Sequence, residues 1–394
     1  MISEQYKAML SGKSVIRELS EYATARGKEI GYDNVFDYSL GNPSVPVPKA
    51  YNDKLIELIQ TGDPMLVHGY SPSLGIPAVR EKIAASLNRR FAMNYKGEDI
   101  FMTSGAAGAL AHAFRLVTTP GDEILTFAPF FPEYNPYVNL TGAKLRVVPA
   151  SFDDFQINFE AFEEMLTASV HAVLVNTPNN PSGVAYSTET LKKLAEILLA
   201  KEKQFGHEIW LISDEPYREI VFSGSDAPYV SKFYPRTLSC YSFSKSLSLP
   251  GDRIGYVAVN PASGVSKMLA TMCGQISRGI GHNCPTALMQ LAVADCCDLT
   301  ADLSVYETNM NLLLGELTSL GFDIVRPGGT FYMFPKALED DAVAFSKKAM
   351  KHDLILVPGD SFGAPGYFRI AYCVDTAKVE RSLDAFRRFV KAQY

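Results

Sequence analysis

The stretch SFSKSLSLPGDRIGY, residues 242–256, places a single lysine, Lys245, among serines and ahead of Arg253. It lies between two apolar runs, Thr237 to Ser242 and Arg253 to Val259. Serine hydroxyls and the planar fork of an arginine can together bind one phosphate. A nearby cation and loss of water would lower the pKa of Lys245, which makes its amine a better nucleophile toward an aldehyde. A serine-rich surface loop is the alternative interpretation of this stretch.

Similar short apolar runs recur upstream, and several are continuous rather than alternating. Continuous runs are typical of strands that are buried on both faces of a mostly parallel sheet. Helical patterns separate them, for example 107–117 and 188–201, where Ser187 or Thr188 is a plausible N-cap. This alternation predicts an α/β sandwich. The upstream runs are Ile100 to Met102, Glu123 to Phe127, Ala172 to Asn176 and Ile209 to Ser213.

The two ends of the chain have a different pattern. The length of 394 residues suggests about two domains. The first 40 or so residues show no clear periodicity, and we expect them to pack with the C-terminal part. From Pro285 to Leu320 the pattern predicts one long helix, and an α+β portion follows that ends in a helix around 378–391.

Composition excludes several classes of protein. Hydrophobic residues make up 47% and charged residues 20%, as in an ordinary globular protein, and the net charge of −6 argues against binding nucleic acid or an anionic membrane. The N-terminus does not resemble a signal peptide, and no apolar run approaches the roughly 20 residues that span a bilayer. We therefore expect a cytoplasmic enzyme. The cysteines contain no CxxC pair, so we expect them to be reduced and mostly structural, with no metal site. They are Cys240, Cys273, Cys284, Cys296, Cys297 and Cys373.

Polar residues follow the predicted strands at the ends where open α/β sheets bind ligands. Small residues at 103–108 open a helix, whose backbone N–H groups favour an anion, although small residues also serve tight packing. Asn180 follows the next strand within NTPNNPSG, residues 176–183, which also has the composition of a rigid turn. Asp214 directly follows an apolar strand, where a carboxylate needs a cation, a hydrogen-bond donor or a structural partner.

Taken together, these motifs resemble the class I/II aminotransferases of fold type I, which use pyridoxal 5′-phosphate (PLP). The resemblance covers nearly the whole chain, and eight motifs stand in the order of that family. They are SLGNP at 39–43, YSPSLGIPAVREKIA at 70–84, SGAAGAL at 104–110, PFFPEY at 129–134, NTPNNPSG at 176–183, SDEPY at 213–217, SFSKSLSLPGDRIGY at 242–256 and FRIAY at 368–372.

The resemblance implies a fold and a domain division. The fold is α/β, with a large PLP-binding domain around a mostly parallel mixed sheet flanked by helices, and a smaller α+β domain. We expect the large domain at residues 46–285 and the C-terminal small domain at 286–394. The N-terminal segment, residues 1–45, is expected to pack with the small domain.

The resemblance also assigns roles in holding PLP. Lys245 resembles the lysine that forms an aldimine with the cofactor and later carries protons, and Asp214 the carboxylate beside the pyridinium nitrogen. Tyr217 and Asn180 correspond to the partners of the phenolic oxygen, and Phe131 to the aromatic residue stacked on the ring. The phosphate is expected on the N–H groups near Gly105 and Ala106, with Ser104, Ser242 and Arg253.

Further roles concern the substrate and a second subunit. Arg369 resembles the arginine that binds the α-carboxylate, beside Asn180 and the backbone of Gly41. Tyr70 matches a tyrosine that reaches the phosphate of the neighbouring subunit, which implies a homodimer with shared active sites. One subgroup of aspartate-type enzymes carries a lysine for the side-chain carboxylate at the position where this chain has Ala107. In the alignment, Arg278 falls near the position of an arginine that another subgroup supplies from the partner subunit for the same purpose, and we hypothesise that Arg278 binds a dicarboxylate.

Three functions follow from this resemblance. The first is transfer of an amino group between an L-amino acid and a 2-oxo acid, with aspartate, glutamate or aromatic substrates. The aromatic residues Phe130, Phe131, Tyr134 and Tyr137 favour hydrophobic substrates or simply pack. The second is a C–S β-lyase of the same fold, which needs a leaving group at Cβ. The third, a non-catalytic regulator, lacks support because no basic helix-turn-helix pattern precedes the GNP motif.

Overall fold

A central seven-stranded sheet organises the chain in the computed structural model, which describes residues 2–11, 14–283 and 285–394. The strand order is β2-β8-β7-β6-β5-β3-β4, and β8 alone runs antiparallel to its neighbours. The sheet is therefore mixed but mostly parallel, as the sequence predicts. Its strands are β2 (Ile100–Thr103), β3 (Glu123–Phe127), β4 (Lys144–Val148), β5 (Val170–Asn176), β6 (Trp210–Asp214), β7 (Thr237–Ser242) and β8 (Gly255–Val259).

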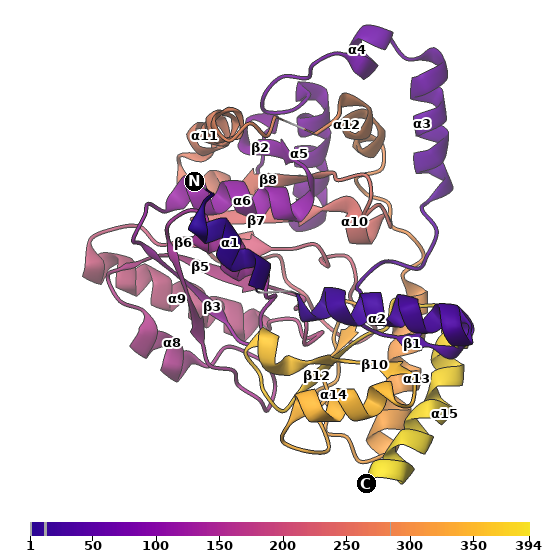
Figure 1. Ribbon diagram of the computed structural model, residues 1–394. Coiled ribbons are helices and arrows are strands. Elements are labelled where there is room, and N and C mark those ends of the chain that lie inside the picture. Colours follow the sequence, from indigo (N-terminus) through magenta and orange to yellow (C-terminus); the bar gives the residue numbers. More distant parts are fainter. Residues whose placement is uncertain (1, 12–13, 284) are drawn as a thin grey trace.

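Helices cover both faces of this sheet (Figure 1). Alternate residues of β5 show why: Ala172 and Leu174 pack in one apolar cluster with α6 and α11, whereas Val173 and Val175 pack in another with α8 and α9. A strand buried on both faces has no solvent side, which explains its continuous apolar run. The helices of this part are α3 (Lys49–Thr61), α4 (Pro64–His68), α5 (Pro77–Phe91), α6 (Gly105–Val117), α7 (Tyr134–Asn139), α8 (Phe159–Met165), α9 (Thr188–Phe205), α10 (Phe243–Ser246), α11 (Ser266–Gly279) and α12 (Ala287–Ala294).

Two smaller sheets lie near the C-terminal end of the chain, lower in Figure 1. One has the order β11-β12-β9, and the other pairs β1 with β10 in parallel. A large apolar cluster joins them to α13 and α15. These elements are β1 (Phe36–Asp37), β9 (Tyr332–Met333), β10 (Leu354–Ile355), β11 (Val357–Pro358), β12 (Phe368–Ala371), α13 (Ser304–Ser319), α14 (Ala342–Met350) and α15 (Thr376–Gln393).

The N-terminal segment contributes more regular structure than its sequence pattern indicates. It forms α1 (Glu4–Ser11) and α2 (Val15–Ile30), and β1 then pairs with β10. Buried Ala23 of α2 packs with Val35 and Ile355. Contacts with distant parts of the chain hold α2 and β1 in place. The domain boundaries at residues 45 and 285 remain predictions.

The prediction of one helix from Pro285 to Leu320 is wrong. The chain forms α12, leaves the helix at Asp295 and begins α13 only at Ser304. Two carboxylates hold the intervening turn: Asp295 pairs with Lys54 and Lys82, and Asp298 with Arg89. These partners lie on α3 and α5, so the break depends on tertiary contacts. Strand β4 was also absent from the predicted strands.

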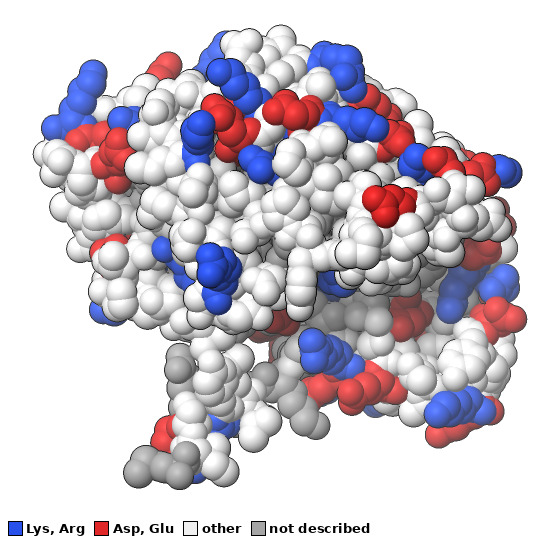
Figure 2. All heavy atoms as spheres, turned by 90° about the horizontal axis from the view of Figure 1, so that it is seen from above, with Lys and Arg blue, Asp and Glu red and all other residues white. Residues whose placement is uncertain are grey.

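Charges of both signs are interspersed on the surface. Figure 2, which views the molecule from above, shows Lys and Arg beside Asp and Glu over much of that face. Among the described residues, no helix has the length and apolar character needed to cross a membrane.

We expect β1 to anchor the N-terminal segment through Phe36, which is 7% exposed within the C-terminal apolar cluster. Phe36→Ala should lower the free energy of unfolding by about 3–5 kcal/mol, because the cavity left behind adds to the lost burial. Phe152, which is 42% exposed, is the matched control, and Phe152→Ala should cost less than about 1 kcal/mol. Urea unfolding measures both; equal losses would contradict the anchoring.

Candidate active site

A cavity of about 340 Å³ opens at the carboxyl edge of the central sheet. Its size lies within the roughly 300–1,000 Å³ that is usual for small-molecule sites. The lining comes from the sheet, from the N-terminal segment and from the C-terminal sheet, so it combines parts far apart in the sequence. The residues predicted for the site that line it are Gly41, Ala106, Phe131, Asn180, Asp214, Tyr217, Ser242, Lys245, Arg253 and Arg369.

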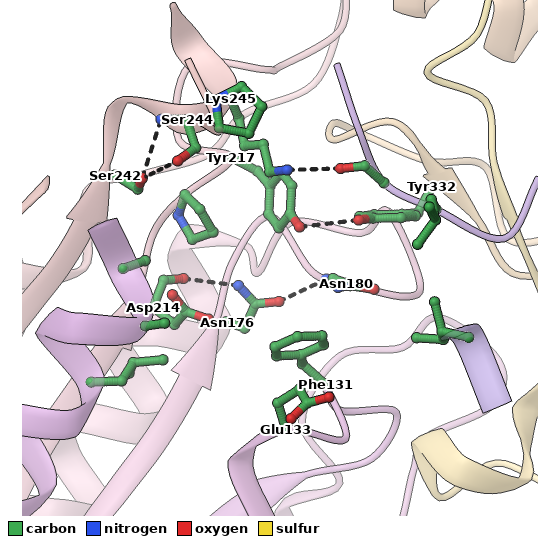
Figure 3. A pocket seen from close by; sticks show the side chains of 18 of the residues that line it. Phe131, Glu133, Asn176, Asn180, Asp214, Tyr217, Ser242, Ser244, Lys245 and Tyr332 are labelled. Atoms are coloured by element: carbon green, nitrogen blue, oxygen red, sulfur yellow. Dashed lines mark hydrogen bonds between the residues drawn. The ribbon is translucent and has the colours of Figure 1, made fainter. Parts of the chain in front are cut away.

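Lys245 lies on α10, one turn beyond the end of β7. Ser242 caps this helix: its hydroxyl accepts from the Ser244 backbone N–H at 3.1 Å and donates to the Ser244 hydroxyl at 2.7 Å. The Lys245 amine donates to the carbonyl of Gly41 at 2.7 Å (Figure 3). Loss of water, together with the cations Arg253 and Arg369 and against an opposing effect of Cys373, lowers the pKa of Lys245 to about 8. The amine is therefore substantially deprotonated at mildly alkaline pH.

Asp214 at the end of β6 is buried and only partly hydrogen bonded. Its Oδ2 accepts from the Tyr134 hydroxyl at 2.6 Å, whereas its Oδ1 has no partner among the described residues. Burial raises the pKa of Asp214 to about 7, against the hydrogen bond from Tyr134, and Glu215 adds to the rise. Asn176 fixes the neighbouring backbone by donating to the Asp214 carbonyl at 2.9 Å. The free oxygen is suited to a ligand N–H group, above all a cationic one.

Arg369 on β12 is also buried without a carboxylate. Its Nη1 donates to Asn180 Oδ1 at 3.0 Å and its Nη2 to the Ser39 carbonyl at 2.5 Å. The Nε atom is buried without a partner among the described residues. Burial lowers the pKa of Arg369 from its usual value, which reflects the cost of keeping this cation away from water. A bound carboxylate would offset that cost.

Arg253 lies against the N-terminus of α6, at the mouth of the cavity. Its Nη2 donates to the Ser104 carbonyl at 3.2 Å. Gly105 has φ of +77°, and a Cβ atom there would lie 2.9 Å from Arg253 Nη2. Only glycine leaves this space open beside the first N–H groups of the helix. The helix end, the guanidinium and Ser242 together can hold an anion.

Tyr217 also lines the cavity, where its hydroxyl contacts that of a second tyrosine. The hydroxyls of Tyr217 and Tyr332 lie 3.2 Å apart, and both side chains point into the cavity (Figure 3). Tyr332 was not predicted as a site residue, because it lies outside the quoted motifs, on a short strand where no sequence pattern indicates a function. Asn176 lines the cavity and Tyr134 donates to Asp214, and neither contact was predicted from the sequence. From the N-terminal segment, Ser14, Ile16 and Arg17 line the cavity.

Four residues predicted for the site do not line the cavity. Ser104 and Gly105 lie next to it, behind Arg253. Tyr70 is fully exposed, and Arg278 is exposed in the last turn of α11. The roles predicted for Tyr70 and Arg278 belong to a second subunit and remain predictions.

Five of the six cysteines lie in the described part of the chain. Cys240, Cys273, Cys296, Cys297 and Cys373 are free, whereas Cys284 lies outside the described residues. Within the described part of the chain, no cluster of His, Cys, Asp and Glu is arranged to hold a metal ion.

Comparison with known proteins places the chain among transferases. The sequence profile described as "Aminotransferase class I and II" matches residues 33–386. An aspartate aminotransferase of Thermotoga maritima is 29% identical over 92% of this chain and 93% of its own length. A probable aspartate/prephenate aminotransferase of Aquifex aeolicus is 31% identical over 94% of both chains. The crystal structure of an amino transferase from Eubacterium rectale superposes with a TM-score of 0.97 at 44% identity, covering 100% of this chain and 99% of that one.

The buried amine of Lys245 should make stability depend on pH. Because its pKa falls from 10.5 to about 8, the unfolded chain holds the extra proton between these values, and wild-type stability rises with pH there. Lys245→Met removes this effect. In cofactor-free protein, the stability of the variant relative to wild type should fall by about 3 kcal/mol from pH 7 to pH 10.5.

Urea unfolding across this pH range measures the difference. Lys203→Met, at an exposed lysine of α9, is the control and should show no such trend. A difference between Lys245→Met and wild type that stays constant with pH would contradict the assignment of a desolvated amine.

Proposed function

The chain belongs to the class I and II aminotransferase family, and from this premise we propose that Lys245 holds PLP while an amino group passes from an L-amino acid to a 2-oxo acid. The fold is that of the fold type I enzymes, in agreement with the solved amino transferase structure. One observation carries the proposal. A desolvated lysine amine lies in the same cavity as a carboxyl oxygen and a guanidinium nitrogen that both lack partners within the described part of the chain.

The unsatisfied groups of the cavity fit PLP part by part. The Asp214 oxygen without a partner fits the ring N–H, and the space kept open at Gly105 beside Arg253 fits the phosphate. Phe131 supplies an aromatic face, and the hydroxyl of Tyr217 a donor for the phenolic oxygen. When bound, PLP supplies an aldehyde that bonds to amines and a ring that withdraws electrons from the substrate Cα.

Asp214 and Lys245 divide the proton chemistry between them. The pKa of Asp214, at about 7 in the free protein, drops when a cationic N–H pairs with its open oxygen, so the carboxylate stays charged. The Lys245 amine, with a pKa near 8, can both accept and donate a proton close to neutral pH. We assign it the proton transfer at the substrate Cα.

Arg369 orients the substrate. Its buried guanidinium has no ion pair with any described residue, and Asn180 already fixes one end of it at 3.0 Å. A planar guanidinium binds a carboxylate through two parallel hydrogen bonds. This places the α-carboxylate beside Gly41, whose carbonyl also holds Lys245. The substrate amine would therefore lie next to Lys245.

The side chain of the substrate faces the N-terminal segment. Ala107 offers no charge there, whereas the exposed Arg17 lines the cavity and forms no ion pair with any described residue. Relatives named as aspartate aminotransferases support an acidic substrate for this chain as well. We therefore propose aspartate or glutamate as amino donors, with aromatic amino acids as the second class.

We propose a homodimer with the large domain at 46–285 and the small domain formed by 286–394 together with segment 1–45. Tyr70 is fully exposed, although its expected role is to contact a phosphate. Apolar side chains of α3 and α4 are exposed nearby in the sequence, which is typical of a surface covered in an oligomer. They are Ile56, Ile59, Met65 and Leu66. Free cysteines support a cytoplasmic location.

Single-turnover assays test the proposed activity. Protein loaded with PLP and mixed with L-glutamate should release 2-oxoglutarate in an amount equal to the active sites, and no further product without an oxo acid. Lys245→Ala should abolish this release. Pyruvate and ammonia formed instead from a substrate with a leaving group at Cβ would contradict transamination and favour the lyase.

Two arginine variants test the substrate class. If Arg17 binds the side-chain carboxylate, Arg17→Ala should lower kcat/KM for aspartate by about 10- to 100-fold and for alanine much less, because one charge-assisted pair is lost. If the partner's copy of Arg278 does so, Arg278→Ala should have that selective effect. Equal losses for both amino acids in both variants would rule out a dicarboxylate site at these arginines.

A further inference from the structure

One buried tyrosine, Tyr332, contacts the groups that the proposed function assigns to substrate and cofactor. It lines the cavity from β9 and is 3% exposed. We propose that Tyr332 is a positioning residue whose hydroxyl donates to Tyr217, linking the substrate-binding Arg369 to the oxygen atom that Tyr217 contacts on PLP. This inference rests on the proposed function and adds a residue to it.

The contacts of Tyr332 extend in three directions. Its hydroxyl lies 3.2 Å from that of Tyr217, and the Arg369 guanidinium lies 4.7 Å from the centre of its ring. Toward the N-terminal segment it packs against Gly41. A Cβ atom at Gly41 would lie 1.8 Å from the Tyr332 hydroxyl, so a side chain at this position would displace that hydroxyl. The carbonyl of the same glycine accepts from Lys245, so Tyr332 also contacts the residue that holds the lysine.

The backbone holds Tyr332 firmly. In the antiparallel pair of β9 and β12, it lies opposite Ala371, two residues beyond Arg369. Its N–H donates to the Thr330 hydroxyl at 3.0 Å. A Cβ atom at Gly183 would lie only 2.3 Å from its carbonyl oxygen, so the NTPNNPSG loop packs directly on it. Strand pairing and this close approach fix the backbone from which the side chain extends toward Tyr217.

The chemistry of the pair decides the direction of its hydrogen bond. If Tyr217 donates its proton to a ligand oxygen, its own oxygen is free to accept from Tyr332. A hydroxyl carries only one proton, so when Tyr217 donates to the ligand, the hydrogen bond between the two hydroxyls runs from Tyr332 to Tyr217.

This direction has a consequence for the bound cofactor. A hydroxyl that accepts a hydrogen bond becomes a stronger donor, because chained hydrogen bonds polarise one another. Tyr217 then stabilises negative charge on the phenolic oxygen, which lowers the pH at which the visible absorption of the loaded protein changes. Other charged or titratable groups face the pair or Lys245, and they are common to all variants compared. They are Asp214, Arg253, Arg369 and Cys373.

The test is a pH titration of the visible absorption band of PLP-loaded protein. Tyr332→Phe keeps the ring over Arg369 and removes only the hydroxyl, so it should raise the midpoint by about 0.3–1 pH unit. Tyr217→Phe should raise it further. The double variant should match Tyr217→Phe alone, because without Tyr217 the hydroxyl of Tyr332 has nothing to polarise.

Tyr38→Phe is the matched control, since Tyr38 also has a buried hydroxyl paired at 2.6 Å, with Ser382, but does not line the cavity. It should leave the midpoint unchanged. A Tyr332→Phe midpoint equal to that of wild type, or additive shifts in the double variant, would overturn the relay and leave the proposed function intact. A wild-type protein without any visible band after PLP is added would overturn both.

Steady-state kinetics distinguish the role of the Tyr332 hydroxyl from that of the Tyr332 ring. Tyr332→Phe should change KM for the amino donor less than about 3-fold, whereas Tyr332→Leu, which removes the ring from Arg369, should raise KM by about 3- to 30-fold. The same KM in Tyr332→Leu as in wild type would overturn the link to Arg369.

Discussion

The site depends on burying charged and titratable groups that the protein alone does not satisfy. Lys245, Asp214 and Arg369 lie in one cavity, and the last two each have a buried polar atom without a partner among the described residues. Such burial lowers stability unless a ligand supplies the missing partners. The stabilisation that offsets this loss comes chiefly from the continuous apolar strands and the helices that cover them. In the proposed function, PLP supplies the partners of Asp214 and Lys245, and the substrate carboxylate supplies the partner of Arg369.

The sheet explains how the groups come together. Strands β5 and β6 are paired so that Asn176 lies opposite Asp214, and β7 ends at Ser242 one strand further along. Parallel strands bring their carboxyl ends to one edge, so residues as far apart in the sequence as Asn176 and Ser242 meet there. Gly41 and Arg369 come from other parts of the chain. Gly41 lies next to the paired strands β1 and β10, and Arg369 lies on β12. Their meeting with Lys245 requires the N-terminal and C-terminal elements to be packed correctly.

Much of this arrangement could be predicted from the sequence, because local signals carried it. The apolar runs identified most strands of the main sheet, and the polar residues directly after them include Asn180, Asp214 and Lys245. Tyr332 carried no such signal, since its place beside Arg369 and Gly41 arises from strand pairing and close packing. The break after α12 was missed for a related reason: the lysines that hold Asp295 lie more than 200 residues earlier. The roles of Tyr70 and Arg278 depend on a second copy of the chain, which no local pattern describes.

In the proposed function, the Lys245 amine is the group that binds the aldehyde of PLP. Borohydride reduction of the loaded protein fixes the cofactor to its lysine, and peptide mapping by mass spectrometry then identifies the modified residue. We expect the modification on Lys245 alone, and we expect L-glutamate added before reduction to prevent it. Modification of another lysine in place of Lys245, or no modification of any peptide, would show that Lys245 does not hold the cofactor.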